Sequence, residues 1–556
     1  MNVHPPFQSG YQFLGKICPL FMFVVALVLA SNSNVMAQTP TGPVPSTFFG
    51  TTIMDSSDWP SIPFGALEKQ PGVQWPYVET SKGNYNWSRL DPYVAKANAK
   101  GVSLVYTSAF VPPWAASDPS SCFSYWYDTT VCTSSVTNIA DWQDFVTALV
   151  TRYKGRIQIY ELWNEPSCTC TFSGTVAQLV ALTNAEHNII RSIDPAALII
   201  GPTPQGYESA YLASYFAAGG TTDIDAVTMH SSPNPDNDVA EFMMGSVTTG
   251  IQSVMKQYGL SSKPLWNTEN DWGSDTYLTA DDQVAFVARD LLLNWNVGVT
   301  RDYWYAWDNT DLGTLWSPST GIGAAGIAYE QVESWMKGST MSPCSLNGSA
   351  NIYDALYTCN LTLSTGNKAQ AVWNTSGNTT YAAPSQFTQY LTLAGNAYSI
   401  PSNHEVTVGQ QPILLKAPAS AGTTGSAMVF NTASLHGTGS GAALNVIDIT
   451  GTMLVATAVG NYVTYTVNVP TAGTYDVKVG VKETFNRGRW QLLINGTDQG
   501  PVEDEYVSTQ ALATFDLGTV TISSSGPQSF KFLIVSKDAQ STGYRAAFES
   551  ITLTPQ

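Results

Sequence analysis

Two glutamates stand where they could act together as a catalytic pair. Glu165 and Glu269 each follow an apolar run, and each has an asparagine and a tryptophan within three residues. Two carboxyl groups about 5 to 5.5 Å apart can cleave a sugar acetal through a covalent glycosyl-enzyme, one as nucleophile and the other as acid and then base. Repulsion between them raises one pKa, so that one is protonated while the other is ionised. Either glutamate alone would more often be a cap or half of a surface ion pair, so the hypothesis depends on the two lying close together.

Other side chains near expected strand ends could bind a sugar. His230 closes the run from Val227 onward, although a lone buried histidine is also common as a core residue. Of the 16 tryptophans, 14 precede residue 341, and indole rings pack well on the C–H faces of sugars. The candidates at or just after strand ends are Trp75, Trp114, Trp272, Trp304 and Trp307. We expect Trp307 to lie under the sugar, with Trp304 as the alternative, while any single tryptophan could belong to the core instead.

Eight strands alternating with helices would position these residues. The expected strands are residues 48–53, 73–75, 104–108, 157–162, 198–201, 226–230, 264–268 and 301–306. Helical patterns lie between them, such as the apolar stripe from Trp142 to Tyr153 and the segment 281–295, for which Thr279 is a suitable N-cap. Eight such units predict an α/β fold, a (β/α)8 TIM barrel, with an open doubly wound sheet as the alternative. In a barrel, Glu165 and Glu269 would follow the fourth and seventh strands and reach one mouth.

The composition changes after the expected barrel, which we place at residues 46–340. Residues 341–416 lose the helical periods and show short alternating runs, which predicts a small β-rich accessory domain. Residues 417–426 (APASAGTTGS) have the composition of a linker. Strand-like alternation returns in residues 427–556 and predicts a C-terminal β-sandwich, a jelly roll.

Residues 1–37 have the pattern of an export signal. Lys16 is followed by the apolar run Leu20 to Ala30 and a small-residue site that ends at Ala37. This run is too short to span a bilayer, which takes about 20 residues, although an uncleaved anchor is the alternative. We expect the signal to be removed, and the protein to be secreted to an extracellular or periplasmic location without membrane contact afterwards.

Six cysteines follow the signal, which fits disulfide bonds in an oxidising compartment. They are Cys122, Cys132, Cys168, Cys170, Cys344 and Cys359. Spacing favours Cys344 with Cys359 and leaves the pairing of the other four open. The chain has five histidines and none at zinc-ligand spacing from a cysteine pair, so we expect no metal site and no cofactor.

The charge of the chain narrows the choice of partner. It has 24 Lys and Arg against 42 Asp and Glu, a formal net charge of −18, which would repel phosphate backbones and anionic lipid. We therefore expect no nucleic-acid partner. Charged residues make up 12% of the chain and aromatic residues another 12%, so an uncharged polymer fits the polar and aromatic side chains better.

The surroundings of the two glutamates resemble a known group of enzymes. The run Trp163-Asn164-Glu165-Pro166, with a second glutamate after a later apolar strand, is similar to the retaining glycoside hydrolases of clan A. The runs GVQWPYVE (72–79), GNYNW (83–87) and PPWA (112–115) make residues 46–415 most similar to family 39 and its relatives. The resemblance implies that Glu165 is the acid/base, Glu269 the nucleophile and Asn164 a donor to the sugar 2-hydroxyl. It also implies a role for His230, although Ser232 stands where relatives often have an aromatic residue, and their active-site arginine has no clear counterpart.

The C-terminal region resembles the carbohydrate-binding jelly rolls of families 6 and 35. The similar runs are GNYVTY (460–465), AGTYDV (472–477) and residues 543–553, while the usual opening Glu-Ala-Glu is missing. The resemblance makes Trp490 and Tyr506 candidates for stacking on a sugar. A purely structural sandwich is the alternative.

These features together predict a secreted retaining glycoside hydrolase that acts on a polysaccharide or oligosaccharide. We favour a polysaccharide as the substrate, because a sandwich that binds the polymer raises the concentration of substrate near the barrel. One alternative is an exo-acting, β-xylosidase-like glycosidase, and another is a non-catalytic glycan-binding protein on the same fold. The sequence leaves open the sugar, the linkage, endo or exo action, and the oligomeric state.

Overall fold

The computed structural model describes most of the chain after the predicted signal. The described residues are 39–55, 57–68, 72–206, 208–231, 240–241, 247–309, 311–347, 351–417, 427–435, 437–440, 443–446 and 451–556. The predicted signal, residues 1–37, and all but the first residue of the predicted linker lie outside them. Within the described residues, no helix has the length and apolar character needed to cross a membrane.

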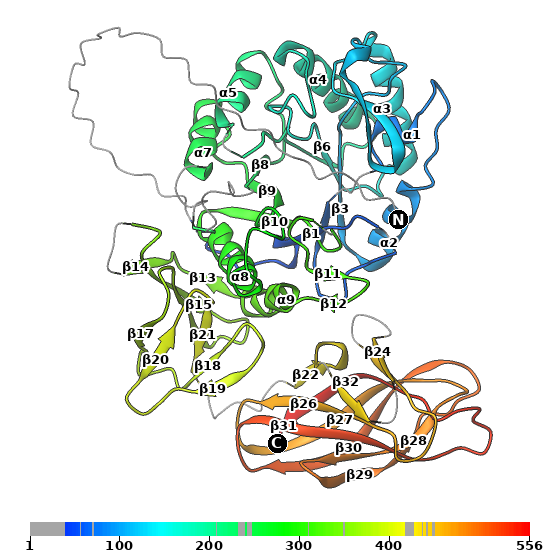
Figure 1. The fold of residues 1–556 in the computed structure, drawn as a ribbon, viewed down its shortest axis with the longest axis vertical. Helices are drawn as coiled ribbons and strands as arrows, with labels where there is room; N and C mark the ends of the chain where they lie inside the picture. The colour runs from blue at the N-terminus through cyan, green and yellow to red at the C-terminus, as the bar shows by residue number, and fades with distance from the viewer. Residues whose placement is uncertain are drawn as a thin grey trace. The chain divides into compact units, whose positions relative to one another are not determined.

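Eight parallel strands form a closed ring (Figure 1). They are β1 (Phe49–Thr52), β2 (Ala66–Glu68), β3 (Ser103–Thr107), β6 (Ile159–Glu161), β7 (Leu198–Ile200), β8 (Val227–His230), β9 (Leu265–Asn270) and β10 (Val299–Trp304). Their hydrogen-bonded order is β7-β6-β3-β2-β1-β10-β9-β8. A parallel bridge between Ile200 and Ala226 joins the two ends of this order and closes the ring. The predicted (β/α)8 barrel is therefore confirmed, and the open sheet is excluded.

Helices lie outside the ring of strands (Figure 1). They are α1 (Trp75–Val78), α2 (Leu90–Lys100), α3 (Ile139–Tyr153), α4 (Val176–Ile193), α5 (Ser209–Ala217), α7 (Val247–Gln257), α8 (Ala280–Asn296) and α9 (Ala324–Met336). Helix α8 begins as predicted, because the Thr279 side chain accepts from the Asp282 amide. Helix α3 buries the predicted stripe from Trp142 to Tyr153 against the strands.

The second strand differs from the prediction. Residues 73–75 were expected to be extended, but the strand is Ala66–Glu68, and Trp75 begins the short helix α1. Proline suits the first turn of a helix because it has no amide hydrogen to satisfy, and Pro76 stands there. A strand of three residues without a β-branched side chain carries too little pattern to be found from sequence.

The ring is filled by one layer of inward-facing residues. Ala66, Val105, Ile159, Ile200, Ala226, Trp266 and Tyr303 form a buried cluster separate from the core between strands and helices. Gly50 makes room for this layer, because a Cβ atom there would lie 2.7 Å from Cδ1 of Tyr303. The barrel is packed at this level, and the next inward positions of β3, β6 and β9, two residues further along each strand, are polar: Thr107, Glu161 and Thr268.

Antiparallel strands follow the barrel. They are β13 (Thr340–Met341), β14 (Ser345–Asn347), β15 (Leu356–Thr362), β16 (Lys368–Asn374), β17 (Thr379–Ala382), β18 (Gln389–Leu391), β19 (Ala397–Ser399), β20 (Glu405–Val408) and β21 (Ile413–Lys416). Tyr357 and Trp373 belong to the same hydrophobic core as the barrel. The β-rich unit also contacts a buried ion pair: Arg289 of α8 is paired with Glu241 (3.2 Å), and the indole of Trp373 in β16 donates to Glu241 (2.8 Å).

The last part of the chain is a sandwich of two antiparallel sheets. Its strands are β22 (Met428–Asn431), β23 (Thr438–Ser440), β24 (Ala443–Val446), β25 (Thr452–Val455), β26 (Tyr462–Val469), β27 (Gly473–Glu483), β28 (Gly488–Ile494), β29 (Thr497–Asp504), β30 (Ala511–Ile522), β31 (Gly526–Lys537) and β32 (Ala546–Pro555). Buried and more exposed residues alternate along its long strands β26, β27, β28 and β31. This period of two places one face of each sheet in the core, and the predicted sandwich is confirmed.

Two buried carboxyl groups tie helix α8 to strand β10. They are linked through Asn270 of β9, which donates both to Asp290 of α8 and to Asp302 of β10 (3.3 Å), and Asn294 of α8 also donates to Asp290 (3.1 Å). Burial raises the pKa of Asp290 to about 8 despite hydrogen bonds from Asn270 and Asn294. Burial and the charge of Asp290 also raise the pKa of Asp302. The pair therefore holds at least one proton at neutral pH.

This proton makes stability depend on pH. An unfolded aspartate has a pKa of about 3.9, so between about pH 4 and pH 8 the folded chain binds more protons, and its stability falls as pH rises. Asp290→Asn keeps a neutral side chain of the same size at every pH. We expect its loss of melting temperature between pH 5 and pH 8 to be smaller than that of the wild type by about 2 °C or more. Calorimetry measures the melting temperatures, and Asp281→Asn, at the exposed start of α8, is the control. An equal pH dependence of the melting temperature in all three proteins would contradict the raised pKa of Asp290.

Candidate active site

Three ionisable side chains meet at the mouth of the barrel. Glu165 follows β6, His230 ends β8, and Glu269 lies in β9. One carboxylate oxygen of each glutamate and one histidine nitrogen all lie within 4.8 Å of one another. His230 Nδ1 is 2.9 Å from Oε1 of Glu165 and 3.8 Å from Oε2 of Glu269. The glutamate side chains are 17% and 19% exposed, so both are accessible to a substrate, whereas His230 is buried beneath them.

The backbone beyond strand β6 holds Glu165 in place. Its φ of 44° lies in the left-handed region, which costs free energy for a residue with a side chain. The Cys168 amide donates to the Glu165 carbonyl (2.9 Å), and the Asn164 amide donates to the Ser108 carbonyl (2.9 Å). Trp163 fixes the turn from below, because its buried ring packs on Trp142 (5.7 Å between centroids). The buried Trp163 thus stabilises the turn that carries Glu165.

Glu269 is positioned by a strand with partners on both sides. It pairs with His230 of β8, and its carbonyl accepts from the Ser231 amide (3.1 Å). The pairing shifts register between Met229 and His230, and β9 and β10 shift similarly near their ends. Such irregularities re-aim side chains at barrel rims. Here the shift places His230 directly opposite Glu269 on the neighbouring strand.

Electrostatics make His230 a cation at neutral pH. Burial lowers its pKa, but the charge of Glu269, the hydrogen bond to Glu165 and the charges of Glu165 and Glu161 outweigh burial and raise the pKa to about 9. Its Nδ1 therefore carries a proton that faces Glu165. Among the described groups, the buried Nε2 of His230 has no hydrogen-bond partner.

A third carboxylate, which the sequence analysis did not single out, lies beneath the site. Glu161 is fully buried and accepts from Thr107 (2.8 Å), Thr268 (2.7 Å) and Thr203. These threonines come from, or follow, β3, β9 and β7. An acidic residue inside an apolar strand was the available signal. Glu161 adds negative charge that favours the protonated form of His230.

The same trio is the one group, within the described residues, with the spacing to hold a metal ion. A histidine binds a metal in its neutral form. Because the pKa of His230 is raised to about 9, metal binding would first have to displace its proton at neutral pH.

Several tryptophans predicted to touch a substrate are core residues. Trp75, Trp272 and Trp304 are at most 1% exposed, so their rings cannot stack on a sugar, and that prediction is wrong for all three. Their indole N–H groups are used internally, by Glu79, Asp275 and the Gly313 carbonyl in that order. All three rings belong to the main hydrophobic core of the barrel.

The other two predicted tryptophans, Trp114 and Trp307, differ in their exposure. Trp114 is half-buried against Trp75 and donates to the Glu79 carbonyl (2.9 Å). Trp307 is 1% exposed, so its ring cannot stack on a sugar either and that prediction is wrong as well, although its buried N–H has no hydrogen-bond partner among the described groups. Trp316, which the sequence analysis did not single out, is half-buried and stacks parallel to Trp307 (5.9 Å). Asn164, next to Glu165, is half-buried as well.

In the sandwich, the structure separates the two predicted sugar contacts. Trp490 is fully buried in the core and donates to the buried Glu505 (2.7 Å), so stacking on a sugar is excluded and that prediction is wrong. Tyr506 is half-buried, and its hydroxyl donates to Gln540 (3.2 Å). Strand alternation explains the difference, because Trp490 is an inward position of β28.

The six cysteines form three local disulfides. Cys344 pairs with Cys359, as predicted, and the other bonds are Cys122–Cys132 and Cys168–Cys170. The Cys168–Cys170 bond lies just after Glu165, and the Cys122–Cys132 bond closes a hairpin after β3. Two of the three bonds thus constrain loops at the mouth.

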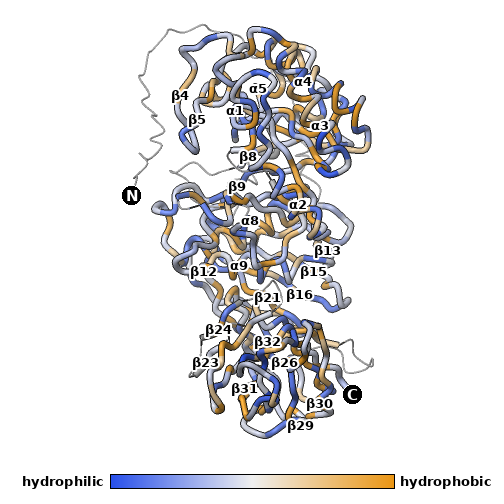
Figure 2. The backbone as a smooth tube through the Cα atoms, turned by 90° about the vertical axis from the view of Figure 1, so that its right-hand side faces the viewer, coloured by the Kyte–Doolittle hydropathy of each residue, from blue (hydrophilic) through white to orange (hydrophobic). Residues whose placement is uncertain are grey.

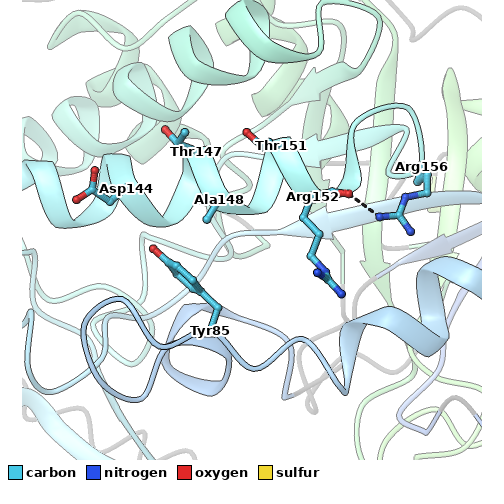
Figure 3. Close-up of a pocket in the computed structure, with 7 residues that line it drawn as sticks. All are labelled: Tyr85, Asp144, Thr147, Ala148, Thr151, Arg152 and Arg156. Atoms are coloured by element: carbon cyan, nitrogen blue, oxygen red, sulfur yellow. Dashed lines mark hydrogen bonds between the residues drawn. The ribbon is translucent and has the colours of Figure 1, made fainter.

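A surface hollow of about 790 Å³ lies along helix α3 (Figure 3). It is lined by Tyr85, Asp144, Thr147, Ala148, Thr151, Arg152 and Arg156. Asp144 is the one carboxylate among these lining residues, and Arg152 is paired with Asp91 (2.7 Å). The hollow lacks a pair of carboxylates and is not a candidate for the same chemistry.

Comparison with known proteins gives structural likenesses at low identity. No family model matches the chain, and no curated sequence matches it. A glucosidase from Croceicoccus marinus is 12% identical, with 90% of this chain and 98% of that chain covered and a TM-score of 0.44. A GH39 beta-xylosidase from Caulobacter crescentus is 14% identical, with 69% and 98% covered and a TM-score of 0.48. A GH30 endoxylanase from Clostridium papyrosolvens is 14% identical, with 69% and 99% covered and a TM-score of 0.46. At these values the function has to be argued from the site itself.

The raised pKa of His230 can be measured directly. We expect its imidazole to titrate near pH 9 in an NMR titration of the histidine-labelled chain, with His230→Gln identifying the signal. Glu269→Gln should move the titration down by about one pH unit or more, because a neighbouring negative charge is lost. Glu405→Gln, on the exposed face of β20, is the control. A His230 titration that Glu269→Gln leaves in place would contradict the electrostatic account.

Proposed function

We propose that this chain is a secreted glycoside hydrolase that cleaves a polysaccharide with retention of configuration. The observation that supports this most is the approach of Glu165 and Glu269, whose nearest carboxylate oxygens are within 4.8 Å at one barrel mouth. Retaining enzymes hold their carboxyl groups about 5 to 5.5 Å apart, whereas inverting enzymes leave about 6.5 to 9.5 Å for a water molecule. The short gap favours direct attack on the sugar.

In the first step, the ionised Glu269 attacks the anomeric carbon while Glu165 donates a proton to the glycosidic oxygen. The bond from the anomeric carbon to that oxygen breaks, and a covalent ester with Glu269 forms. In the second step, Glu165 takes a proton from water, the water oxygen bonds to the anomeric carbon, and the ester breaks. Two inversions give net retention.

His230 supports this cycle as a proton partner of Glu165. The 2.9 Å contact allows a proton to move from His230 Nδ1 to Glu165 Oε1, which leaves a neutral imidazole and a protonated acid. As a cation, His230 also offsets the repulsion between the two glutamates. Asn164 is proposed to donate to the sugar 2-hydroxyl.

Two isosteric variants test the assignment. Glu165→Gln should lower kcat on substrates with poor leaving groups by about 10² to 10⁴-fold, because general acid catalysis is lost. Glu269→Gln should lose at least as much on every substrate, because no ester can form. Aryl glycosides and a panel of polysaccharides are the substrates, Glu405→Gln is the control, and NMR of the first product reports its anomeric configuration.

The outcomes separate the alternatives. Full activity of Glu269→Gln would refute its role as nucleophile, and an inverted product would refute the two-step reaction. If the wild type binds glycans and cleaves none of them, the chain is a glycan-binding protein. Shortening of a polymer from one end would identify an exo-acting glycosidase.

The C-terminal sandwich is proposed to hold the polymer at the end that carries Tyr506. Phe485 is 54% exposed there, and a bridge between Thr484 and Tyr506 brings the two loops together. The Thr542 amide donates to the Phe485 carbonyl (3.0 Å), which adds a third loop. Exposed aromatic rings on converging loops suit the C–H faces of a sugar.

Removal of these rings should weaken polymer binding. We expect Phe485→Ala and Tyr506→Ala each to reduce retardation in polysaccharide-containing gels, with about a tenfold weaker Kd. Activity on small aryl glycosides should stay unchanged, because they do not need the tether. Leu512→Ala, at a 75% exposed position of β30, is the control. Equal retardation of the wild type and all three variants would refute sugar binding at this end of the sandwich and favour a purely structural role.

A further inference from the structure

A disulfide-closed hairpin stands at the barrel mouth beside the candidate site. It consists of β4 (Cys122–Tyr125), the turn Trp126–Asp128 and β5 (Thr129–Cys132), and Cys122 is bonded to Cys132. The hairpin belongs to the loop after β3, which lies between β2 and β6 in the ring. Figure 2 shows β4 and β5 next to helix α1. The proposed catalysis does not use it.

The body of the hairpin is anchored by aromatic packing. Phe123 and Tyr125 lie on one face and contact Phe110, with ring centroids 6.3 and 5.4 Å away. Phe110 and Val131 are buried beneath them. The short disulfide loop and this apolar seat leave the hairpin little freedom, so the tip is presented in a defined position.

The tip carries two exposed aromatic rings. Trp126 is 38% exposed and Tyr127 is 44% exposed. Tyr127 is held in place by the Arg89 guanidinium, 3.6 Å from its ring centroid, and by close contact with Gly72, where a Cβ atom would lie 2.6 Å from the ring. Tyr127 and Asp128 both have positive φ, a conformation that costs free energy. The fold therefore keeps both rings partly exposed at the tip, although the turn that carries them costs free energy.

The hairpin is continuous with the candidate site. The loop that carries it begins beside Glu165, because the carbonyl of Ser108, directly after β3, accepts from the Asn164 amide, and Val111 of the same loop exchanges backbone hydrogen bonds with Cys132 at the base of the hairpin (2.9 Å each). At its tip, the Tyr127 hydroxyl donates to the Met54 carbonyl (3.4 Å), and the Met54 amide donates to Asp308 (2.6 Å). Asp308 follows Trp307, just beyond β10. The hairpin thus runs along the rim from the strand beside Glu165 to the loops after β1 and β10.

The chemistry of the tip indicates its ligand. Aromatic faces pack on the C–H faces of sugars, and the chain carries a formal net charge of −18, which disfavours a polyanion. We propose that Trp126 and Tyr127 form a further binding subsite for a neutral sugar unit of the same polysaccharide, beyond the unit that reacts. This inference rests on the proposed function.

Such a subsite would act only on substrates long enough to reach it. The test compares kcat/KM of wild type, Trp126→Ala and Tyr127→Ala on an aryl monosaccharide and on neutral oligosaccharides of two to six units. The aryl substrate should be cleaved equally well by all three, whereas the gain with chain length should fall by about tenfold in each variant. Tyr353→Ala, which removes a 42% exposed ring from the β-rich unit after the barrel, is the control.

The outcomes distinguish this subsite from the proposed activity. If the wild type cleaves and Trp126→Ala retains the full gain with chain length, the subsite is refuted while the activity stands. If the wild type cleaves nothing, the activity fails, and gel retardation by arabinoxylan, mixed-linkage β-glucan and galactomannan decides the subsite. Weaker retardation of both tip variants than of Tyr353→Ala supports it. Three results would overturn the subsite: unchanged retardation of the tip variants, retardation by the charged polygalacturonate alone, or a wild-type dimer that the substitution Trp126→Ala dissociates.

Discussion

Charge balance at the barrel mouth is the constraint on which the site depends. Glu165 and Glu269 approach within 4.8 Å, and Glu161 is fully buried below them. Negative charges so close together in a low-dielectric interior are costly unless they are protonated or paired. His230 offsets the upper pair, and three threonine hydroxyls satisfy Glu161. The two glutamates can therefore stay close, share protons and remain accessible.

The ring of short parallel strands gives this arrangement its precision. His230 and Glu269 are paired with each other across β8 and β9, so their distance is set by backbone hydrogen bonds. Glu165 lies beyond its strand and depends instead on the buried Trp163 and on a strained turn. Catalytic groups on strands and braced turns are held more closely than groups on free loops. The packed layer that contains Tyr303 fills the ring below the site.

Aromatic residues divide into two populations with different functions. Trp75, Trp272 and Trp304 are buried wedges between strand ends and helices. Trp126 and Phe485 instead lie exposed on loops. For the uncharged polymer proposed as substrate, such exposed rings would be the main contacts, because a chain with 12% charged residues offers few ion pairs. The Cys122–Cys132 disulfide closes the hairpin that carries Trp126.

The sequence by itself determined the alternation of strands and helices, the N-cap at Thr279 and the place of both glutamates near strand ends, because periodicity and capping are local properties. It failed for the strand Ala66–Glu68, which is too short to carry a pattern, and for the tryptophans at strand ends. Whether such an indole faces the mouth or the helix layer depends on residues far away in the chain. The same holds for the contact between Glu165 and His230, 65 positions apart, and for the burial of Glu161 among three threonines. Only closure of the ring decided these features, since it sets the distances between residues that share no local pattern.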